Sequence, residues 1–184
     1  MSKLISIITV NYNGFNDTCE LIDTLPLNDD SLEVIVIDNA SEKNEALLIE
    51  ARYPNVKAIR SNTNLGFAGG NNLGINAATG KYLFFINNDT IIKDFNINVL
   101  INRLESSSKI GMVCPKIRFA WEDNPIQFAG YTKLSRITLR NKAIGFGEKD
   151  MEQHNTPHPT PYAHGAAMLV KREALEKVGK MPEC

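Results

Sequence analysis

The stretch YLFFINNDT, residues 82–90, joins an apolar run to a cluster of polar side chains. Its first five residues, Tyr82 to Ile86, have the composition of a strand that is buried on both faces. Two amides, a carboxylate and a hydroxyl follow at residues 87–90. Polar groups at the carboxyl end of such a strand lie where open α/β sheets bind their ligands. The alternative is a turn followed by a helix cap, because Asn, Asp and Thr favour both places.

Apolar, β-branched runs alternate with helical patterns on both sides of this stretch. Strands are expected at residues 4–10, 32–37, 56–59 and 82–86, and helices at 17–25, 42–52, 70–78 and 95–104. Ser41 is the candidate N-cap of the second helix. This alternation predicts an α/β fold with a mostly parallel central sheet and helices on both faces.

The pattern changes after Gly111. Further strands are expected at residues 112–119, 126–131 and 162–170, and a last helix at 171–178, which Gly179 ends. Residues 140–161 are rich in Gly, Pro, His and charge, which predicts a long, mobile loop of the kind that is usually functional or disordered.

The composition is that of one soluble globular domain. The chain has 184 residues, 43% of them hydrophobic and 22% charged, and a formal net charge of -1. This balance creates no strong field, so neither nucleic acid nor an anionic membrane surface is indicated as a partner. The three cysteines Cys19, Cys114 and Cys184 form no C-x-x-C pair, which indicates reduced thiols in a cytosolic protein.

The chain also shows no targeting or membrane-spanning pattern. Its first apolar run lacks a basic leader and a small-residue cleavage site, which favours a strand over a signal peptide. No apolar stretch approaches the roughly 20 residues that a membrane helix needs. The expected location is the cytoplasm, and peripheral association with the inner face of the membrane stays open.

Polar residues follow three of the expected strands. VNYNG begins at Val10, IDNAS at Ile37 and NNDT at Asn87. In a parallel sheet these ends share one edge, so the ring of Tyr12 and the carboxylates of Asp38 and Asp89 converge on one crevice. A ring can stack on a base, one carboxylate can accept hydrogen bonds from a nucleoside, and the other can hold a divalent cation against a diphosphate. A capping role for Asp38 and a core role for Tyr12 are the alternatives.

Two other nucleotide-binding patterns are not matched. A dinucleotide-binding domain needs G-x-G-x-x-G directly after its first strand, where this chain has NYNG. The glycine-rich segment at residues 66–72 follows the third strand and has a different spacing, and no G-x-x-x-x-G-K-[ST] motif occurs.

Four ordered motifs carry a resemblance to a known family. They are TVNYNG, VIDNAS, NLGFAGGNNLGINAATGKYLFFINNDT and HGAAMLVKREALEKVG. Together they resemble an inverting family 2 glycosyltransferase with the GT-A fold, and most of all the rhamnosyltransferase-like enzymes of bacterial surface polysaccharide synthesis. The resemblance extends over residues 5–181 and is loosest at residues 140–161. It implies transfer of a hexose from a UDP- or dTDP-sugar to a glycan or lipid-linked acceptor.

The resemblance also implies roles for single residues. On the donor side, Val10 and Tyr12 would contact the nucleoside and Asp38 would hydrogen-bond the base. The ribose and diphosphate side would be formed by Asn64, by the segment that contains Gly66, Gly70 and Asn71, and by Asn88. Asp89 would bind Mg2+ or Mn2+ as the last residue of a D-x-D-like motif, in which Asn87 replaces the first aspartate. His164 and Gly165 would lie on the acceptor side.

The domain expectation is a single GT-A domain over residues 1–184, with a nucleotide-binding half at 1–110 and the start of an acceptor-binding half at 111–184. The resembled family carries its catalytic base in an acidic stretch after the helix that matches residues 171–178. The base is therefore expected beyond Cys184, with Glu183 as the rival candidate, and the 184 residues are expected to bind donor with negligible transfer. A nucleotide-sugar-binding module without catalysis and a sugar nucleotidyltransferase are the alternatives.

Overall fold

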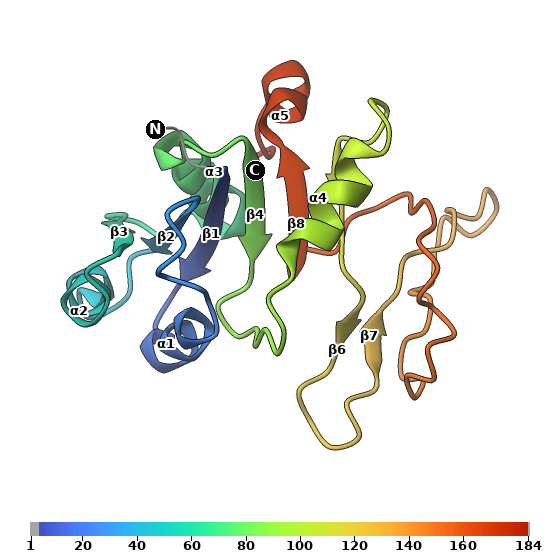
Figure 1. Ribbon diagram of the computed structural model, residues 1–184, viewed down its shortest axis with the longest axis horizontal. Helices are drawn as coiled ribbons and strands as arrows, with labels where there is room; N and C mark the ends of the chain where they lie inside the picture. Colours follow the sequence, from blue (N-terminus) through green and yellow to red (C-terminus); the bar gives the residue numbers. More distant parts are fainter. Residues whose placement is uncertain (1–3, 184) are drawn as a thin grey trace.

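The computed structural model describes residues 4–183 of the chain (Figure 1). The elements follow one another as β1 (Ile5–Asn11), α1 (Phe15–Asp23), β2 (Leu32–Asp38), α2 (Glu45–Arg52), β3 (Val56–Arg60), α3 (Gly66–Ala77), β4 (Tyr82–Ile86), α4 (Ile97–Glu105), β5 (Met112–Val113), β6 (Ile117–Arg118), β7 (Ile126–Phe128), β8 (Ala167–Lys171) and α5 (Arg172–Val178).

Six strands form the central sheet in the order β3-β2-β1-β4-β8-β5. All of them run in one direction except β8, which is antiparallel to β4 and to β5. Asn11 at the end of β1 pairs with Asp38 at the end of β2, so the carboxyl ends of these strands share one edge. The predicted α/β fold with a mostly parallel sheet is therefore confirmed.

Helices cover both faces of this sheet (Figure 1). Ile7 of β1 packs into an apolar cluster with residues of α1, α2 and α4, whereas Ile8 packs into a second cluster with residues of α3 and α5. Consecutive strand residues point to opposite faces, so β1 needs apolar side chains at both positions. Phe84 and Phe85 of β4 divide between the two clusters in the same way.

Helix α3 packs against β1 at a distance that only glycine allows. A Cβ on Gly74 would lie 2.4 Å from Cγ2 of Ile8, and a Cβ on Gly70 would lie 3.0 Å from both γ carbons of Val10. The prediction started this helix at Gly70, but the helix begins at Gly66. Glycines normally weaken a helix, and here they allow close packing of helix on strand.

The chain after β4 departs most from the prediction. The strand expected at residues 112–119 is divided into β5, which joins the central sheet, and β6, which pairs with β7 in a separate two-stranded sheet. The strand expected at 162–170 occupies only Ala167–Lys171. The prediction of Ser41 as a helix cap was also wrong, because α2 begins at Glu45 and the side chain of Asn44 accepts a hydrogen bond from the backbone N–H of Leu47 at 3.3 Å.

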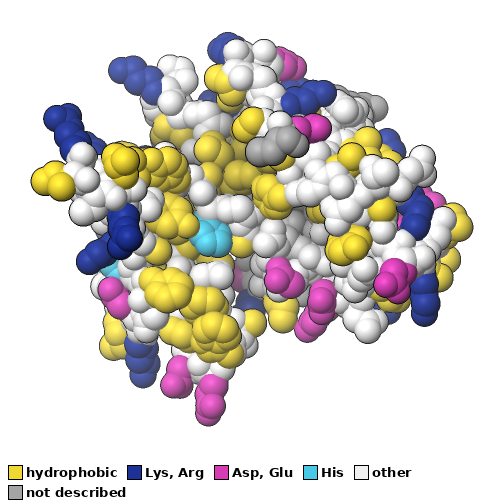
Figure 2. All heavy atoms as spheres, turned by 180° about the vertical axis from the view of Figure 1, so that it is seen from behind, with side chains coloured by type: hydrophobic (Ala, Val, Ile, Leu, Met, Phe, Trp, Pro, Cys, Tyr) yellow, Lys and Arg dark blue, Asp and Glu magenta, His cyan; other side chains and the backbone are white. Residues whose placement is uncertain are grey.

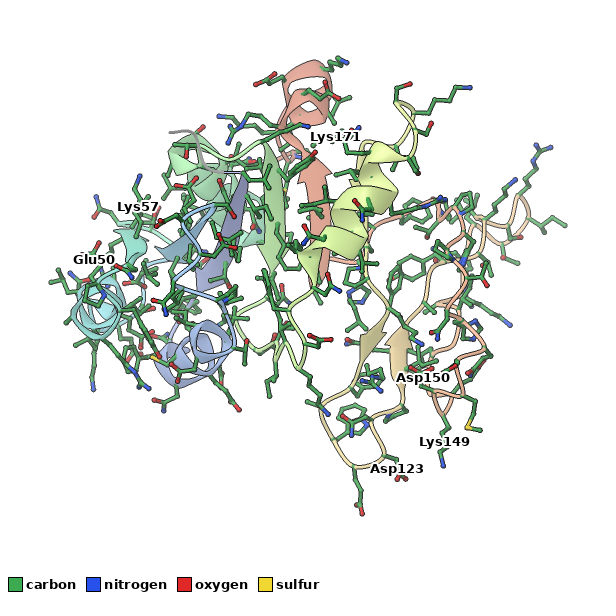
Figure 3. The ribbon with its side chains drawn as sticks, in the orientation of Figure 1. Glu50, Lys57, Asp123, Lys149, Asp150 and Lys171 are labelled. Carbon is green, nitrogen blue, oxygen red and sulfur yellow. The ribbon has the colours of Figure 1, made fainter. Side chains whose placement is uncertain are left out.

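Residues 140–161 contain no helix or strand of the described fold beyond one isolated bridge between Tyr131 and Ala143. Hydrogen bonds nevertheless tie this loop to the small sheet, since the N–H of Ile126 donates to the carbonyl of Glu148 at 2.8 Å. The carboxylate of Asp150, which lies in this loop (Figure 3), also contacts an ammonium of the neighbouring segment, that of Lys116, at 2.7 Å. No helix in the described part of the chain has the length and hydrophobicity of a membrane span.

Candidate functional site

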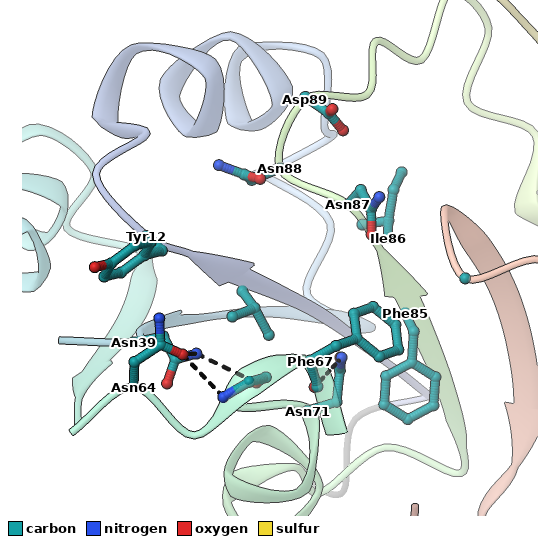
Figure 4. Close-up of a pocket in the computed structure, with 13 residues that line it drawn as sticks. Tyr12, Asn39, Asn64, Phe67, Asn71, Phe85, Ile86, Asn87, Asn88 and Asp89 are labelled. Carbon is teal, nitrogen blue, oxygen red and sulfur yellow. Dashed lines mark hydrogen bonds between the residues drawn. The ribbon is translucent and has the colours of Figure 1, made fainter. Parts of the chain in front are cut away.

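A cavity of about 270 Å³ opens at the carboxyl ends of β1 and β4 (Figure 4). It is lined by Val10, Tyr12, Asn39, Asn64, Gly66, Phe67, Asn71, Phe85, Ile86, Asn87, Asn88, Asp89 and Gly165. Open α/β sheets bind ligands at this edge. The lining combines aromatic rings with amides and has one carboxylate, that of Asp89, and no Lys, Arg or His among the described residues.

Eight of the predicted site residues line this cavity. They are Val10, Tyr12, Asn64, Gly66, Asn71, Asn88, Asp89 and Gly165. The ring of Tyr12 is 53% exposed, so a face is available to a ligand. The core role that was the alternative for Tyr12 does not fit this exposure. Gly70 lies behind the lining, where it lets α3 approach Val10.

The turn after β4 is held by a chain of side-chain hydrogen bonds. The amide of Asn88 donates to Oγ1 of Thr18 at 3.1 Å, and that hydroxyl donates to Oδ1 of Asn11 at 2.8 Å. The amide of Asn11 in turn donates to the carboxylate of Glu45 at 2.7 Å. The chain links β4, α1, β1 and α2, so it fixes the turn that presents Asp89.

Asn39 holds the opposite wall of the cavity (Figure 4). Its amide nitrogen donates to Oδ1 of Asn64 at 3.0 Å and to the carbonyl of Gly66 at 3.2 Å. Its oxygen accepts from the N–H of Leu65 at 2.9 Å. The next residue, Ala40, has a φ of 67°. A non-glycine residue in this left-handed region is uncommon and tends to occur at functional sites.

Asp38 occupies a different environment from the one predicted for a base-binding residue. Its carboxylate is fully buried and accepts from the N–H groups of Ser41 at 3.0 Å and Glu45 at 3.1 Å. It also contacts the guanidinium of Arg60 at 2.6 Å. Burial alone would raise the pKa of Asp38, but the hydrogen bonds and Arg60 lower it below its ordinary value. Because the carboxylate lies outside the cavity lining with its oxygens engaged, this placement favours the capping alternative.

Asp89 is the residue of the cavity suited to a metal ion. It is exposed, and its carboxylate makes no ion pair or side-chain hydrogen bond with any residue of the described range 4–183. No cluster of three His, Cys, Asp or Glu residues suited to a metal occurs within that range. A hard cation prefers oxygen ligands, and one carboxylate leaves most of its shell to phosphate oxygens and water. The residues therefore fit a cation that arrives with a diphosphate.

His164 and Gly165 lie side by side but differ in their relation to the cavity. Gly165 lines it opposite Phe67, whereas His164 packs its ring against Phe128 with centroids 4.9 Å apart. Nδ1 of His164 accepts from the N–H of Ala166 at 3.2 Å, so the neutral ring carries its proton on Nε2. Burial lowers the pKa of His164, which favours this neutral form at neutral pH.

The single-residue predictions omitted several cavity residues. Asn39, Phe67, Phe85, Ile86 and Asn87 line the cavity, although no individual role was predicted for them. Asn39 follows Asp38 in the motif VIDNAS, and that adjacency is the signal that marked it. Phe85 alternates with Phe84, so its place beside the cavity depends on which face of β4 it takes.

The segment after α5 is attached to α3 by the buried side chain of Asn72. The amide of Asn72 donates to the carbonyl of Met181 at 2.8 Å, and its oxygen accepts from the N–H of the same residue at 3.0 Å. It also donates to the carboxylate of Glu183 at 2.7 Å. Glu183 is thus held outside the cavity lining, which gives no support to its predicted alternative role as a base.

Sequence comparison shows the family to which the chain belongs. A sequence model of the family described as "Glycosyl transferase family 2" matches residues 6–179. A protein of Haemophilus influenzae described as "Uncharacterized glycosyltransferase" is 27% identical over 151 residues, which cover 77% of this chain and 50% of that protein. "Low-salt glycan biosynthesis hexosyltransferase Agl10" of Haloferax volcanii is 26% identical over 185 residues, which cover 97% of this chain and 56% of that protein. The chain spans about half the length of these curated relatives.

Solved structures show the same fold. The mannosyltransferase PcManGT of Pyrobaculum calidifontis, in complex with GDP-Man and Mn2+, has a TM-score of 0.66 and 18% identity. The alignment covers 99% of this chain and 48% of that one. Residues 1–349 of TarS from S. aureus have a TM-score of 0.58 and 18% identity, and the alignment covers 95% of this chain and 48% of that one.

Proposed function

The chain belongs to glycosyl transferase family 2 and has a GT-A-like fold, and we propose that it moves a hexose from a UDP- or dTDP-sugar to a glycan or lipid-linked acceptor. The cavity at the strand ends is the proposed donor site. The observation that carries the proposal is its lining, in which an exposed aromatic ring, several amides and one unpaired carboxylate lie together. An aromatic face suits a base, and amides suit ribose and sugar hydroxyls.

Within this site we assign Tyr12 to the base, with Val10 beneath the nucleoside. Asn64, Gly66 and Asn71 then lie along the ribose and diphosphate, opposite Asn88 and Asp89. We assign Asp38 to the support of this site, since its carboxylate holds the start of α2 and its backbone precedes Asn39.

A diphosphate in this cavity requires positive charge that the lining does not contain. We therefore propose that Asp89 holds Mg2+ or Mn2+ against the diphosphate. When bound, such a cation stabilises the negative charge that develops on the leaving phosphate. The solved complex of PcManGT with GDP-Man and Mn2+ agrees with this choice of metal.

The proposed reaction is an inverting displacement, which needs a base on the face opposite the leaving phosphate. Asp89 lies on the metal side, and no second carboxylate lines the cavity in the described part of the chain. We therefore assign no base to residues 4–183. Their proposed task is to bind the donor and orient its anomeric carbon.

The acceptor is proposed to approach along Gly165 and His164. Residues 1–110 then form the nucleotide-binding half of a single domain, and residues 111–184 contribute to the acceptor-binding half. A neutral His164 can donate from Nε2 to a hydroxyl group. The hexosyltransferase from Haloferax volcanii supports a hexose as the transferred group and a glycan product. Rhamnosyl transfer in surface polysaccharide synthesis, at the cytoplasmic face of the membrane, is the proposed context.

Saturation-transfer NMR with a panel of nucleotide sugars tests the proposed function. We expect magnetic saturation to pass from the protein to the base and ribose protons of a UDP- or dTDP-sugar in the presence of Mn2+. Tyr12→Ala should weaken binding about fivefold to 150-fold, because stacking of a base on an aromatic ring contributes about 1–3 kcal/mol. Tyr162→Ala is the matched control, since Tyr162 is 45% exposed and lies outside the cavity lining. An equal loss of donor affinity in both variants would argue against the assignment of Tyr12 to the base. The absence of a saturation-transfer signal from every nucleotide sugar would argue against the donor site itself.

Two other functions make different predictions. A binding module would bind the donor without turnover even as the full-length protein. A sugar nucleotidyltransferase needs a glycine-rich loop with Arg and Lys after β1, where this chain has NYNG.

A further inference from the structure

Residues 132–142, which we call the basic loop, follow β7 and project from the side of the molecule away from β3 (Figure 1). The loop has a defined backbone. The N–H of Thr132 donates to the carbonyl of Lys142 at 3.0 Å, and that of Ser135 donates to the carbonyl of Arg140 at 2.9 Å. Oγ of Ser135 accepts from the N–H of Thr138 at 3.2 Å. These bonds close a turn at residues 135–140, so its side chains are presented outward from an ordered scaffold.

The tip of the basic loop exposes large apolar side chains. Ile137 is 93% exposed and Leu139 is 70% exposed. Leu134 beside them is 43% exposed. A protein surface contains single exposed apolar residues by chance, but an ordered turn that presents two mostly exposed aliphatic side chains is suited to insertion into an apolar phase.

The basic loop also contains four cations, and Figure 2 shows Lys and Arg side chains beside exposed hydrophobic ones at the edge of the molecule. The four cations are Lys133, Arg136, Arg140 and Lys142, and none makes an ion pair or a side-chain hydrogen bond within residues 4–183. The sequence has no Asp or Glu between Asp123 and Glu148. The near-neutral charge of the whole chain therefore hides a local concentration of unpaired positive charge.

We propose that the basic loop docks the protein on an anionic lipid bilayer. Ile137 and Leu139 enter the boundary between head groups and acyl chains, and the four cations contact the anionic head groups. Aliphatic side chains and neighbouring cations are the combination that binds the surface of such a membrane. The long stems of Lys and Arg can cover apolar surface while their charges stay among the head groups.

A nucleic acid is the less suitable occupant of this loop. Proteins that bind single strands add aromatic rings on which bases stack, and residues 132–142 contain no Phe, Tyr or Trp. Two aliphatic side chains at the tip gain nothing from contact with phosphates. The proposal concerns a surface outside the donor cavity, so it does not depend on which nucleotide sugar is bound.

Sedimentation with lipid vesicles tests the proposal on the 184-residue chain. We expect the protein to sediment with vesicles of phosphatidylcholine and phosphatidylglycerol and to stay in solution with phosphatidylcholine alone. The double variant Arg136→Gln/Arg140→Gln should bind about 30-fold more weakly at low ionic strength, since each cation near such a surface raises affinity about fivefold. Ile137→Ser/Leu139→Ser should weaken binding by at least about tenfold.

Matched controls use exposed residues elsewhere in the chain. Lys109→Gln/Lys177→Gln removes two exposed cations, and Val178→Ser removes an apolar side chain that is 82% exposed. Neither control should change sedimentation, and circular dichroism should show the same thermal unfolding for all variants. Equal binding of the wild type and the loop variants would overturn the proposal, as would absence of binding to anionic vesicles. If the arginine variant lost vesicle binding but Ile137→Ser/Leu139→Ser bound as tightly as the wild type, insertion of the two apolar side chains would be overturned.

Discussion

Asp89→Ala is expected to remove the dependence of donor binding on Mg2+ or Mn2+ while leaving the fold intact. Asp89 is the only carboxylate of the cavity lining in residues 4–183, and no Lys or Arg there can replace the cation. A hydrogen bond or contact to a charged group contributes about 1.5–3 kcal/mol, so binding of UDP in Mn2+ should weaken about tenfold to 150-fold. Calorimetric titration of UDP with Mn2+ and with EDTA measures both the affinity and its metal dependence.

The control for Asp89 is Asp94→Ala. Asp94 is also exposed and follows in the same loop, but it does not line the cavity. Its removal should leave both the affinity and the metal dependence unchanged. If Asp89→Ala bound UDP with the metal dependence of the wild type, or if it unfolded, Asp89 would not be the metal-binding residue.

Asp38→Ala is expected to lower the free energy of unfolding by about 1–3 kcal/mol, because it removes a fully buried acceptor from backbone N–H groups and the ion-pair partner of the half-buried Arg60. The change removes the Asp38 acceptor from the backbone N–H groups of Ser41 and Ala46 and the ion-pair partner from Arg60. Urea denaturation measures the loss. Glu176→Ala, which removes an exposed carboxylate from α5, is the control and should change stability by less than about 0.5 kcal/mol.

The same carboxylate gives stability a defined dependence on pH. The pKa of Asp38 is lower in the folded protein than its ordinary value, so its contribution is fully present above that ordinary value. The contribution is lost as the pH falls through the lower folded value. Asp38→Asn should therefore flatten the acid side of the stability profile. If Asp38→Asn instead kept wild-type stability and lost the preference for one base, the predicted contact between Asp38 and the nucleotide would be favoured.

The first half of the chain was predictable because its signals are local. β1, β2, β3 and β4 are short apolar runs separated by helical patterns, and each lies within one residue of its predicted bounds. The three strand ends then follow from the parallel order of the sheet. For this reason Tyr12 and Asp89 could be assigned to one cavity before any contact was known.

The second half depends on contacts between distant segments. β5 and β6 have two residues each, and their pairing with β8 and β7 decides that they are strands. α3 begins at Gly66, where Asn39 accepts from the N–H of Leu65 and donates to the carbonyl of Gly66, and the local pattern does not reveal these contacts.

The different positions of Asp38 and Asn39 relative to the cavity have a similar cause. A left-handed Ala40 and the guanidinium of Arg60 direct the carboxylate inward, and the amide of Asn39 takes the place beside the cavity. Neither the conformation of a single alanine nor the partner of a buried aspartate could be inferred from the motif VIDNAS.

Calorimetric titration of the wild-type chain with UDP, dTDP, ADP and NAD in the presence of Mn2+ tests the proposed donor site most directly. The exposed ring of Tyr12 at this cavity is the proposed contact of a pyrimidine base. The proposed function predicts saturable binding of UDP or dTDP that is tighter than that of ADP or NAD and that weakens when EDTA removes the metal. Equal or tighter binding of the adenine nucleotides, or binding that EDTA does not change, would contradict it.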